Sequence, residues 1–301
     1  MKARIRRSET ILDYNYKDLE KAEKSMIDTW EEFRKELIKP DFKYDDIEKA
    51  KKIKFLRAFD NLFNYSGKEN MICTLSSIER KYFVGRGTKL TDENPLTYSR
   101  FMPVSEYIKN DNRFSPPGVE WIYLSLGNSK FMSKCGAERE CRAEVKDRFG
   151  FCRFKVKDEY SDFKIVDLTL ADKDSYQDIV DRLENVLYKK KEKAIHDVLR
   201  AGFRRNIYSN KDFKTEAPAK EWQLYTYLKM LSLNIFVPLE TEDKSIVYRP
   251  FQTIAKYFES LGYSGIVYSS TVFEHSKNLV LFNKDFVYPS GELLDYKIEK
   301  I

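Results

Sequence analysis

The sequence is poor in the residues that most often build metal centres and acid–base pairs. Among 301 residues there are two histidines, His196 and His275, and four cysteines. No two of the cysteines form a CxxC pair, so the spacing of a zinc site is absent. We therefore expect no metal site, and the low histidine count argues against chemistry built on a histidine base.

Glycine-rich phosphate loops are also missing. The chain contains neither GxGxxG nor GxxxxGK[ST], so neither a Rossmann dinucleotide loop nor a Walker phosphate loop is predicted. No repeat at a fixed period and no low-complexity tract is visible. Two common routes to nucleotide binding and the repeat architectures are thereby excluded.

Long apolar runs are absent as well. The basic start, MKARIRRSETILDYNYKDLE, has no apolar stretch behind it, and no run of eighteen apolar residues occurs. The sequence therefore predicts no signal peptide and no membrane partner. We expect a soluble cytoplasmic protein with reduced thiols.

Aromatic and charged side chains, by contrast, are plentiful. Hydrophobic residues make up 42% and aromatic residues 15%, which is ample for a packed core. The formal net charge is +6, from 54 basic and 48 acidic residues that are mixed along most of the chain. A nucleic-acid partner is therefore not favoured. The densest basic run, residues 188–205, is interpreted as the solvent side of a helix, with a phosphate-binding stripe as the alternative.

Apolar periodicity changes character near residue 71. Residues 17–38 and about 45–64 carry apolar side chains at steps of three and four, which predicts two antiparallel helices. From residue 71 onward, short apolar and partly β-branched segments predict strands. The predicted strands are residues 71–77, 81–87, 120–126, 150–157, 163–170, 265–270 and 278–283. The neighbours 150–157 and 163–170 are expected to form a hairpin.

The sum is an α+β fold in two parts. Residues 1–70 are predicted to form a helical N-terminal extension packed outside a mixed sheet core, and residues 71–301 the remaining domain. The second part carries a helical insertion over about 172–235 and a helix over 248–261 that closes at Gly262. The extension holds none of the candidate site residues, so its deletion is expected to leave the chemistry intact.

Several polar side chains fall at predicted strand edges or tight turns. Arg86 and Arg113 are interpreted singly as surface ion pairs, and Tyr123 as a core aromatic residue. Glu144 suits a solvated helix position, and Ser270 a turn or cap. Taken together they suggest a chemistry. Two arginines can grip a diphosphate, a tyrosine can stack on a planar base, and a carboxylate can stabilise an oxocarbenium-like ribose. A serine can orient the ribose or amide, and the set suits cleavage of a nucleotide such as NAD at its nicotinamide–ribose bond.

The chain also resembles the RES-domain family, which is named for an Arg, a Glu and a Ser. Three stretches carry the likeness: RFSPPGVEWIY, CRAEVK and YRPFQTIAKYFESLGYSGIVYSSTVFEHSKNLVLF. The matching residues are Arg113, Pro117, Gly118, Tyr123, Glu144, Tyr248, Gln252, Ser270 and Asn278. The likeness covers about residues 80–283, and its C-terminal block is the most specific part.

Two positions depart from the family pattern. The family's first arginine often sits in YRAR or YRI, whereas FVGRG offers Arg86 in this chain. The glutamate lies further from Tyr123 than in compact members, so Glu140 competes with Glu144 for that place.

The resemblance implies an ADP-ribosyltransferase-like fold that consumes NAD as a substrate and needs no cofactor. It implies catalytic roles for Arg86, Glu144 and Ser270. It implies substrate-binding roles for Arg113, Tyr123, Gln252 and Asn278. Many relatives are toxins that deplete NAD and are held in check by a partner, so an inhibitory antitoxin or immunity protein is expected.

Three functions stay open at this point. The first is an NAD-degrading enzyme, either a glycohydrolase or a phosphorylase. The second is transfer of ADP-ribose to a protein or nucleic acid, which differs from the first only in the acceptor. The third is a non-catalytic nucleic-acid-binding or scaffolding protein, which the basic run at 188–205 supports.

Overall fold

The computed structural model describes residues 19–65, 68–91, 96–200, 224–232, 244–274 and 276–299. Parts of three predicted segments lie outside the described residues. These parts are 1–18 and 66–67 of the N-terminal extension, 201–205 of the basic run, and 201–223 and 233–235 of the helical insertion.

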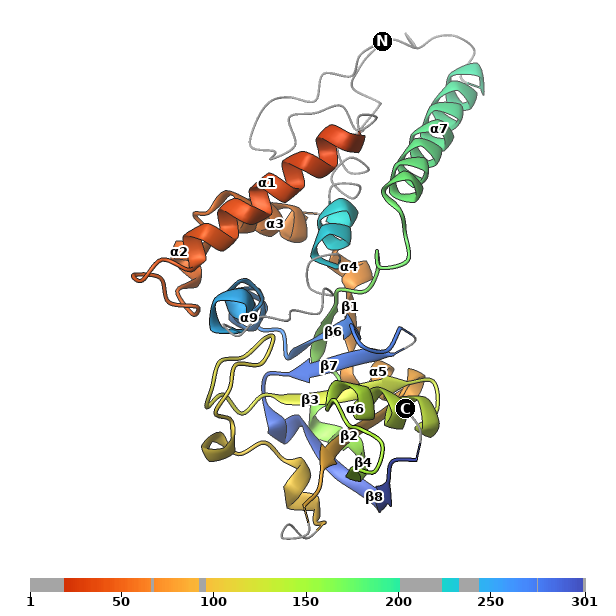
Figure 1. The fold of residues 1–301 in the computed structure, drawn as a ribbon. Helices are drawn as coiled ribbons and strands as arrows, with labels where there is room; N and C mark the ends of the chain where they lie inside the picture. The colour runs from red at the N-terminus through yellow and green to blue at the C-terminus, as the bar shows by residue number, and fades with distance from the viewer. Residues whose placement is uncertain are drawn as a thin grey trace.

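An eight-stranded mixed sheet lies at the centre of the described fold (Figure 1). Its strand order is β1-β5-β6-β7-β3-β2-β4-β8, and β5 and β6 pair in parallel whereas the other neighbours pair antiparallel. The strands are β1 (Ile72–Thr74), β2 (Phe83–Lys89), β3 (Ile122–Gly127), β4 (Arg148–Val156), β5 (Lys164–Asp167), β6 (Gly265–Ser269), β7 (Lys277–Leu281) and β8 (Val287–Lys297). An α+β fold with a mixed sheet is therefore confirmed at this level.

The predicted hairpin of β4 and β5 is wrong. β4 pairs with β2 and β8, whereas β5 pairs with β1 and β6, in the other half of the sheet. The reason is β8, an 11-residue strand that the sequence analysis does not predict and that occupies the free edge of β4. Short connections favour a hairpin only while that edge is available.

Helices cover the sheet on both faces and at one end (Figure 1). They are α1 (Leu19–Leu37), α2 (Ile47–Ala50), α3 (Lys54–Tyr65), α4 (Lys68–Met71), α5 (Leu75–Lys81), α6 (Lys130–Glu140), α7 (Tyr176–Arg200), a helix over 224–232 and α9 (Lys244–Ser260). Short 3-10 turns add η1 (Tyr98–Phe101), η2 (Ser105–Tyr107), η3 (Asp158–Tyr160) and η4 (Lys284–Phe286). No helix in these ranges has the length and apolar character needed to cross a bilayer.

The N-terminal helices pack on α9, and α9 packs on β6. The predicted apolar face of α9 is buried, with Phe251, Ile254 and Phe258 each at most 3% exposed. Gly262, with φ of +83°, ends the helix in the left-handed region, as predicted. The described residues before β1 contribute no strand, but their aromatic side chains belong to the same hydrophobic core as α9 and one face of the sheet.

Candidate functional site

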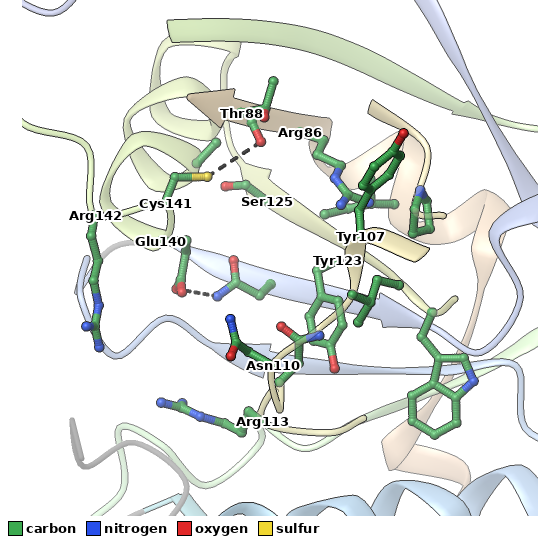
Figure 2. Close-up of a pocket in the computed structure, with 18 of the residues that line it drawn as sticks. Arg86, Thr88, Tyr107, Asn110, Arg113, Tyr123, Ser125, Glu140, Cys141 and Arg142 are labelled. Atoms are coloured by element: carbon green, nitrogen blue, oxygen red, sulfur yellow. Dashed lines mark hydrogen bonds between the residues drawn. The ribbon is translucent and has the colours of Figure 1, made fainter. Parts of the chain in front are cut away.

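A cleft of about 670 Å³ opens where β2 separates from β3 (Figure 2). β2 pairs with β3 only over Phe83–Gly85, and it continues along β4 from Gly85 to Lys89. Arg86 is therefore the first residue beyond the pairing with β3, and it lines the cleft. The walls also include the C-terminal end of α6, the segment between η1 and β3, and residues of α9, β6 and β7, namely Tyr248, Tyr268 and Asn278.

Arg86 is the most unusual side chain of this cleft. Its Nη1 atom is buried and has no hydrogen-bond partner among the described residues. Burial lowers the pKa of the Arg86 guanidinium to about 10, so the group is still a cation at neutral pH. A buried cation without an acceptor is costly, which points to an anionic ligand.

The flanking glycines explain how the backbone around Arg86 fits. A Cβ atom on Gly85 would lie 2.3 Å from the Phe151 ring, and one on Gly87 would lie 2.4 Å from the Phe149 ring. Ala137 of α6 would be 3.1 Å from the same Gly87 position. Glycine at both places lets the β4 rings and α6 approach the strand closely.

Glu140 is the last residue of α6 and lines the cleft. Its Oε1 atom accepts hydrogen bonds from Ser270 Oγ at 2.7 Å and from Asn278 Nδ2 at 2.5 Å. Its Oε2 atom has no hydrogen-bond partner in the part of the chain that the structure describes. The carboxylate stands at the negative end of the helix dipole, which disfavours it there unless a ligand compensates. One oxygen is thus fixed by neutral donors while the other is free.

Ser270 caps a turn, which is one of the interpretations that the sequence allows, and it does not line the cleft. Its hydroxyl donates to Glu140, and it accepts backbone N–H groups from Val272 at 3.3 Å and Phe273 at 3.0 Å. It therefore caps the turn after β6 and holds the carboxylate from behind. Asn278 on β7 also donates to this carboxylate, from the neighbouring strand, and its side chain lines the cleft.

Glu144 does not line this cleft, and its predicted placement there is wrong. The residue is exposed, in a turn where its backbone N–H donates to Asp147 Oδ2 at 2.9 Å. Helix α6 ends at Glu140, and Arg142, with φ of +49°, turns the chain away from the cleft. The alternative glutamate, Glu140, does line the cleft.

The sequence analysis also does not predict α6, which carries Glu140. The face of α6 that packs on the sheet is built from Ser133, Gly136 and Ala137, so no stripe of large apolar residues marks it. The available signal is Ser129, whose side chain caps the helix by accepting from the Met132 N–H at 3.2 Å.

The predicted substrate-binding residues divide into two groups. Arg113 and Tyr123 line the cleft, where Arg113 Nη2 donates to Thr271 Oγ1 at 3.4 Å. The Tyr123 hydroxyl is 2.9 Å from Ser115 Oγ, and burial raises its pKa. Gln252, in contrast, is 2% exposed and lies behind the wall of the cleft.

The charged lining is strongly unequal. Its cations are Arg86, Arg100, Lys109, Arg113 and Arg142, and its carboxylates are Asp111 and Glu140. None of these five cations forms an ion pair with an acidic side chain of the described ranges. Aromatic rings share the lining, including Tyr107, which is 74% exposed. Such a cleft suits an anionic ligand that contains a planar ring.

Two further observations concern thiol and metal chemistry in the cleft. Burial raises the pKa of the Cys141 thiol to about 11, so this neighbour of Glu140 is not a thiolate at neutral pH. Its Sγ donates to the Gly87 carbonyl at 3.5 Å. Among the described residues no group of three or more His, Cys, Asp and Glu side chains could hold a metal ion.

Comparison with known proteins adds no relative. No protein-family model, no curated protein and no solved structure matches this chain.

Proposed function

We propose that this protein cleaves the nicotinamide–ribose bond of NAD, on a fold of the ADP-ribosyltransferase type. One observation carries the proposal. A single cleft contains a buried guanidinium nitrogen without a partner, at Arg86, and a carboxylate held by two neutral donors, at Glu140. The resemblance to the RES-domain family supports the same substrate.

The arginines would bind the diphosphate. Arg86 and Arg113 both line the cleft, and neither is neutralised by an acidic side chain of the described residues. A guanidinium binds phosphate oxygens by two parallel hydrogen bonds, so the pair can hold the ligand before the reaction and during it. Tyr123 and the exposed Tyr107 offer ring faces for the planar groups of the dinucleotide.

Glu140 would act on the ribose. As the C1′–N bond breaks, its electron pair moves to the nicotinamide ring and neutralises the pyridinium charge, while positive charge develops on the ribose. The free Oε2 atom of Glu140 can stabilise that charge because Ser270 and Asn278 fix the other oxygen. A water or phosphate oxygen then forms the new bond to C1′, and an attacking water releases one proton to the solvent.

The function is tested by incubating the purified protein with NAD, with and without inorganic phosphate. Free nicotinamide is measured by chromatography, and the other product by mass. We expect nicotinamide with ADP-ribose, or with ADP-ribose 1-phosphate when phosphate is the acceptor. Label that appears on a macromolecule instead would identify transfer of ADP-ribose. Absence of nicotinamide under all conditions, with salt-sensitive binding of DNA or RNA, would support the non-catalytic alternative.

A further inference from the structure

The buried side chain of Gln252 is hydrogen-bonded to the loop that carries Arg113. Its Nε2 atom donates both of its hydrogens, to Asp111 Oδ1 at 2.8 Å and to the Asn112 carbonyl at 3.2 Å. These acceptors belong to the two residues that precede Arg113. Gln252 thus contacts the loop that carries the arginine and does not line the cleft.

The same loop is anchored on the other side of Arg113. Phe114 is fully buried and meets the Tyr268 ring edge-on, at 4.8 Å between centroids. The Gly118 N–H donates to the Ile108 carbonyl at 2.9 Å and closes the base of the loop. Arg113 therefore stands between two fixed neighbours, Asn112 and Phe114. Of these anchors, only the hydrogen bonds from Gln252 to Asp111 and Asn112 come from α9.

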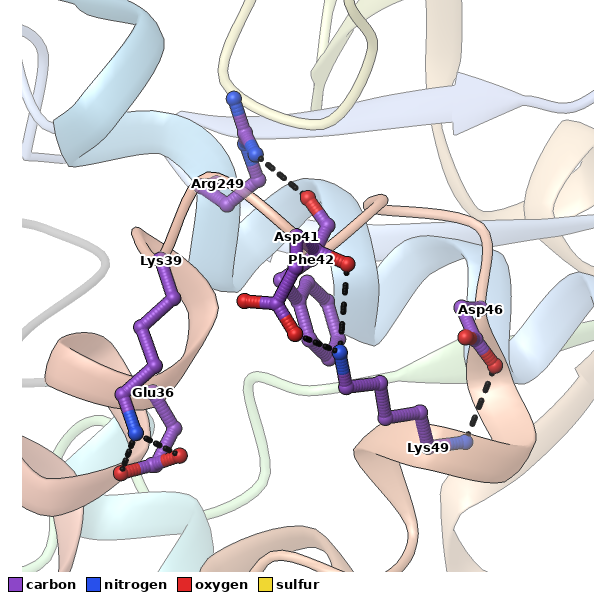
Figure 3. A network of polar contacts seen from close by, with 7 residues as sticks. All are labelled: Glu36, Lys39, Asp41, Phe42, Asp46, Lys49 and Arg249. Atoms are coloured by element: carbon purple, nitrogen blue, oxygen red, sulfur yellow. Dashed lines mark hydrogen bonds and ion pairs between the residues drawn. The ribbon is translucent and has the colours of Figure 1, made fainter.

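α9 is in turn held from its opposite side. Arg249, three residues before Gln252, donates through Nη1 to the Phe42 carbonyl at 3.1 Å (Figure 3). Phe251 packs against Trp30 of α1 at 5.6 Å between ring centroids. One turn of α9 thus contacts the N-terminal helices on one side and the loop of the cleft on the other.

We propose that Gln252 is a positioning residue, which fixes the Arg113 loop to α9 and so sets where this guanidinium meets its anionic ligand. Its role for NAD rests on the proposed function, whereas its role in holding the loop does not. Loss of the two hydrogen bonds should loosen residues 108–118. It should weaken binding through Arg113 and leave the reaction of the bound substrate nearly unchanged.

The test compares Gln252→Met with a matched control, Thr253→Val. Methionine keeps the length of glutamine and removes the donor. Thr253 is equally buried on the same helix, but its hydroxyl donates only to Arg249 O within α9. Hydrogen–deuterium exchange of the Asn112 and Gly118 amides needs no ligand. We expect exchange to rise roughly tenfold in Gln252→Met and to stay as in the wild type in Thr253→Val.

A binding arm uses NAD as the probe. Gln252→Met should raise the Kd for NAD about tenfold, with kcat changed by less than about threefold. In an Arg113→Ala background the same change should add less than about twofold, because Gln252 acts through that arginine. An equal effect in both backgrounds would overturn the positioning role.

The outcomes separate this proposal from the proposed function. If the wild-type protein neither binds nor cleaves NAD but Gln252→Met still speeds loop exchange, the proposed function is wrong and the positioning role stands. Unchanged exchange in Gln252→Met would remove the positioning role, whatever NAD does. Should Gln252→Met fail to fold, Asp111→Ala deletes the 2.8 Å bond from the half-buried loop side, and it must give the same faster exchange.

Discussion

The two sides of α9 are built on opposite principles. Toward the N-terminal helices lies a dry aromatic core in which Phe33, Phe55, Phe59 and Tyr227 approach one another at ring-centroid distances between 4.9 and 6.2 Å. Toward the loop of Arg113 lies a cleft with five cations and two carboxylates. The core gains from every contact, whereas the cleft lining keeps an excess of three positive charges.

This difference separates stability from binding within one helix. Aromatic pairs gain free energy from burial and from edge-to-face packing. The buried Nη1 of Arg86 loses hydration without gaining a partner among the described residues. We infer that the first region holds the second in shape, and each prediction below changes one region and measures both.

Deleting residues 1–65 should have the largest effect. The sequence suggests a separable extension, but its aromatic residues share a core with Phe251 and Phe258 of α9. Removal would expose that face of α9. We therefore expect the truncated chain to bind a hydrophobic dye and to show no cooperative unfolding transition. Calorimetry and dye fluorescence make the measurement. A soluble truncated chain with a sharp transition and full nicotinamide release would restore the idea of a separable extension.

Phe59→Ala should come next, and it acts on stability alone. The ring is fully buried and lies 5.9 Å from Phe258 and 6.1 Å from Tyr257 between centroids. Its loss leaves a cavity, which costs about 3–5 kcal/mol of the free energy of unfolding. Urea denaturation measures this cost. The matched control is Phe131→Ala, a 65% exposed phenylalanine of α6, where we expect a change within about 0.5 kcal/mol.

Glu140→Gln should act on turnover alone. The amide keeps the shape of the side chain but removes the negative charge that faces the developing cation on the ribose. Loss of such a group costs on the order of a hundredfold or more in rate, or about 2.7 kcal/mol. NAD should still bind, because the arginines are unchanged. Glu144→Gln, on the exposed turn, should release nicotinamide at the wild-type rate. If Glu144→Gln alone abolishes release, the assignment of the carboxylate to Glu140 fails.

The contrast between the aromatic core and the cleft also explains what the sequence could predict. Large apolar residues at regular spacing marked the N-terminal helices, α9 and the strands beside it, because burial imposes that spacing. The cleft was partly foreseen, since Arg86, Arg113, Tyr123 and Asn278 do line it together.

What the sequence could not predict was packing without large side chains. α6 approaches β3 so closely that a Cβ on Gly127 would lie 2.2 Å from the Ser133 nitrogen. Only small residues permit that approach, and they leave no periodic apolar signal. Without α6 there was no basis for choosing Glu140 over Glu144. The edge strand β8 has few buried residues, so it too lacked the alternation that marks a strand.

Arg86→Met should have a small effect on stability, with an informative sign. Burial lowers the pKa of this guanidinium to about 10, so the folded chain holds the proton less tightly than the unfolded chain. The destabilisation is fully present well below pH 10 and fades as the pH rises through and above the folded pKa of about 10. At neutral pH it is therefore fully present, and removing the charge should stabilise the fold. Methionine is flexible and apolar, so it can fill the space without a new polar group. We expect the free energy of unfolding to rise by about 1 kcal/mol.

The same change should weaken NAD binding at least tenfold, through loss of a charge-assisted contact. Arg113→Met is the comparison, because this half-exposed arginine already donates to Thr271. Arg113→Met should weaken NAD binding without raising the free energy of unfolding. Urea denaturation and titration with NAD at pH 7.5 measure both quantities for both variants. A lower free energy of unfolding in Arg86→Met would mean that the guanidinium stabilises the empty cleft. Arg86 would then contribute to stability, and the contrast between the two sides of α9 would not apply to this residue.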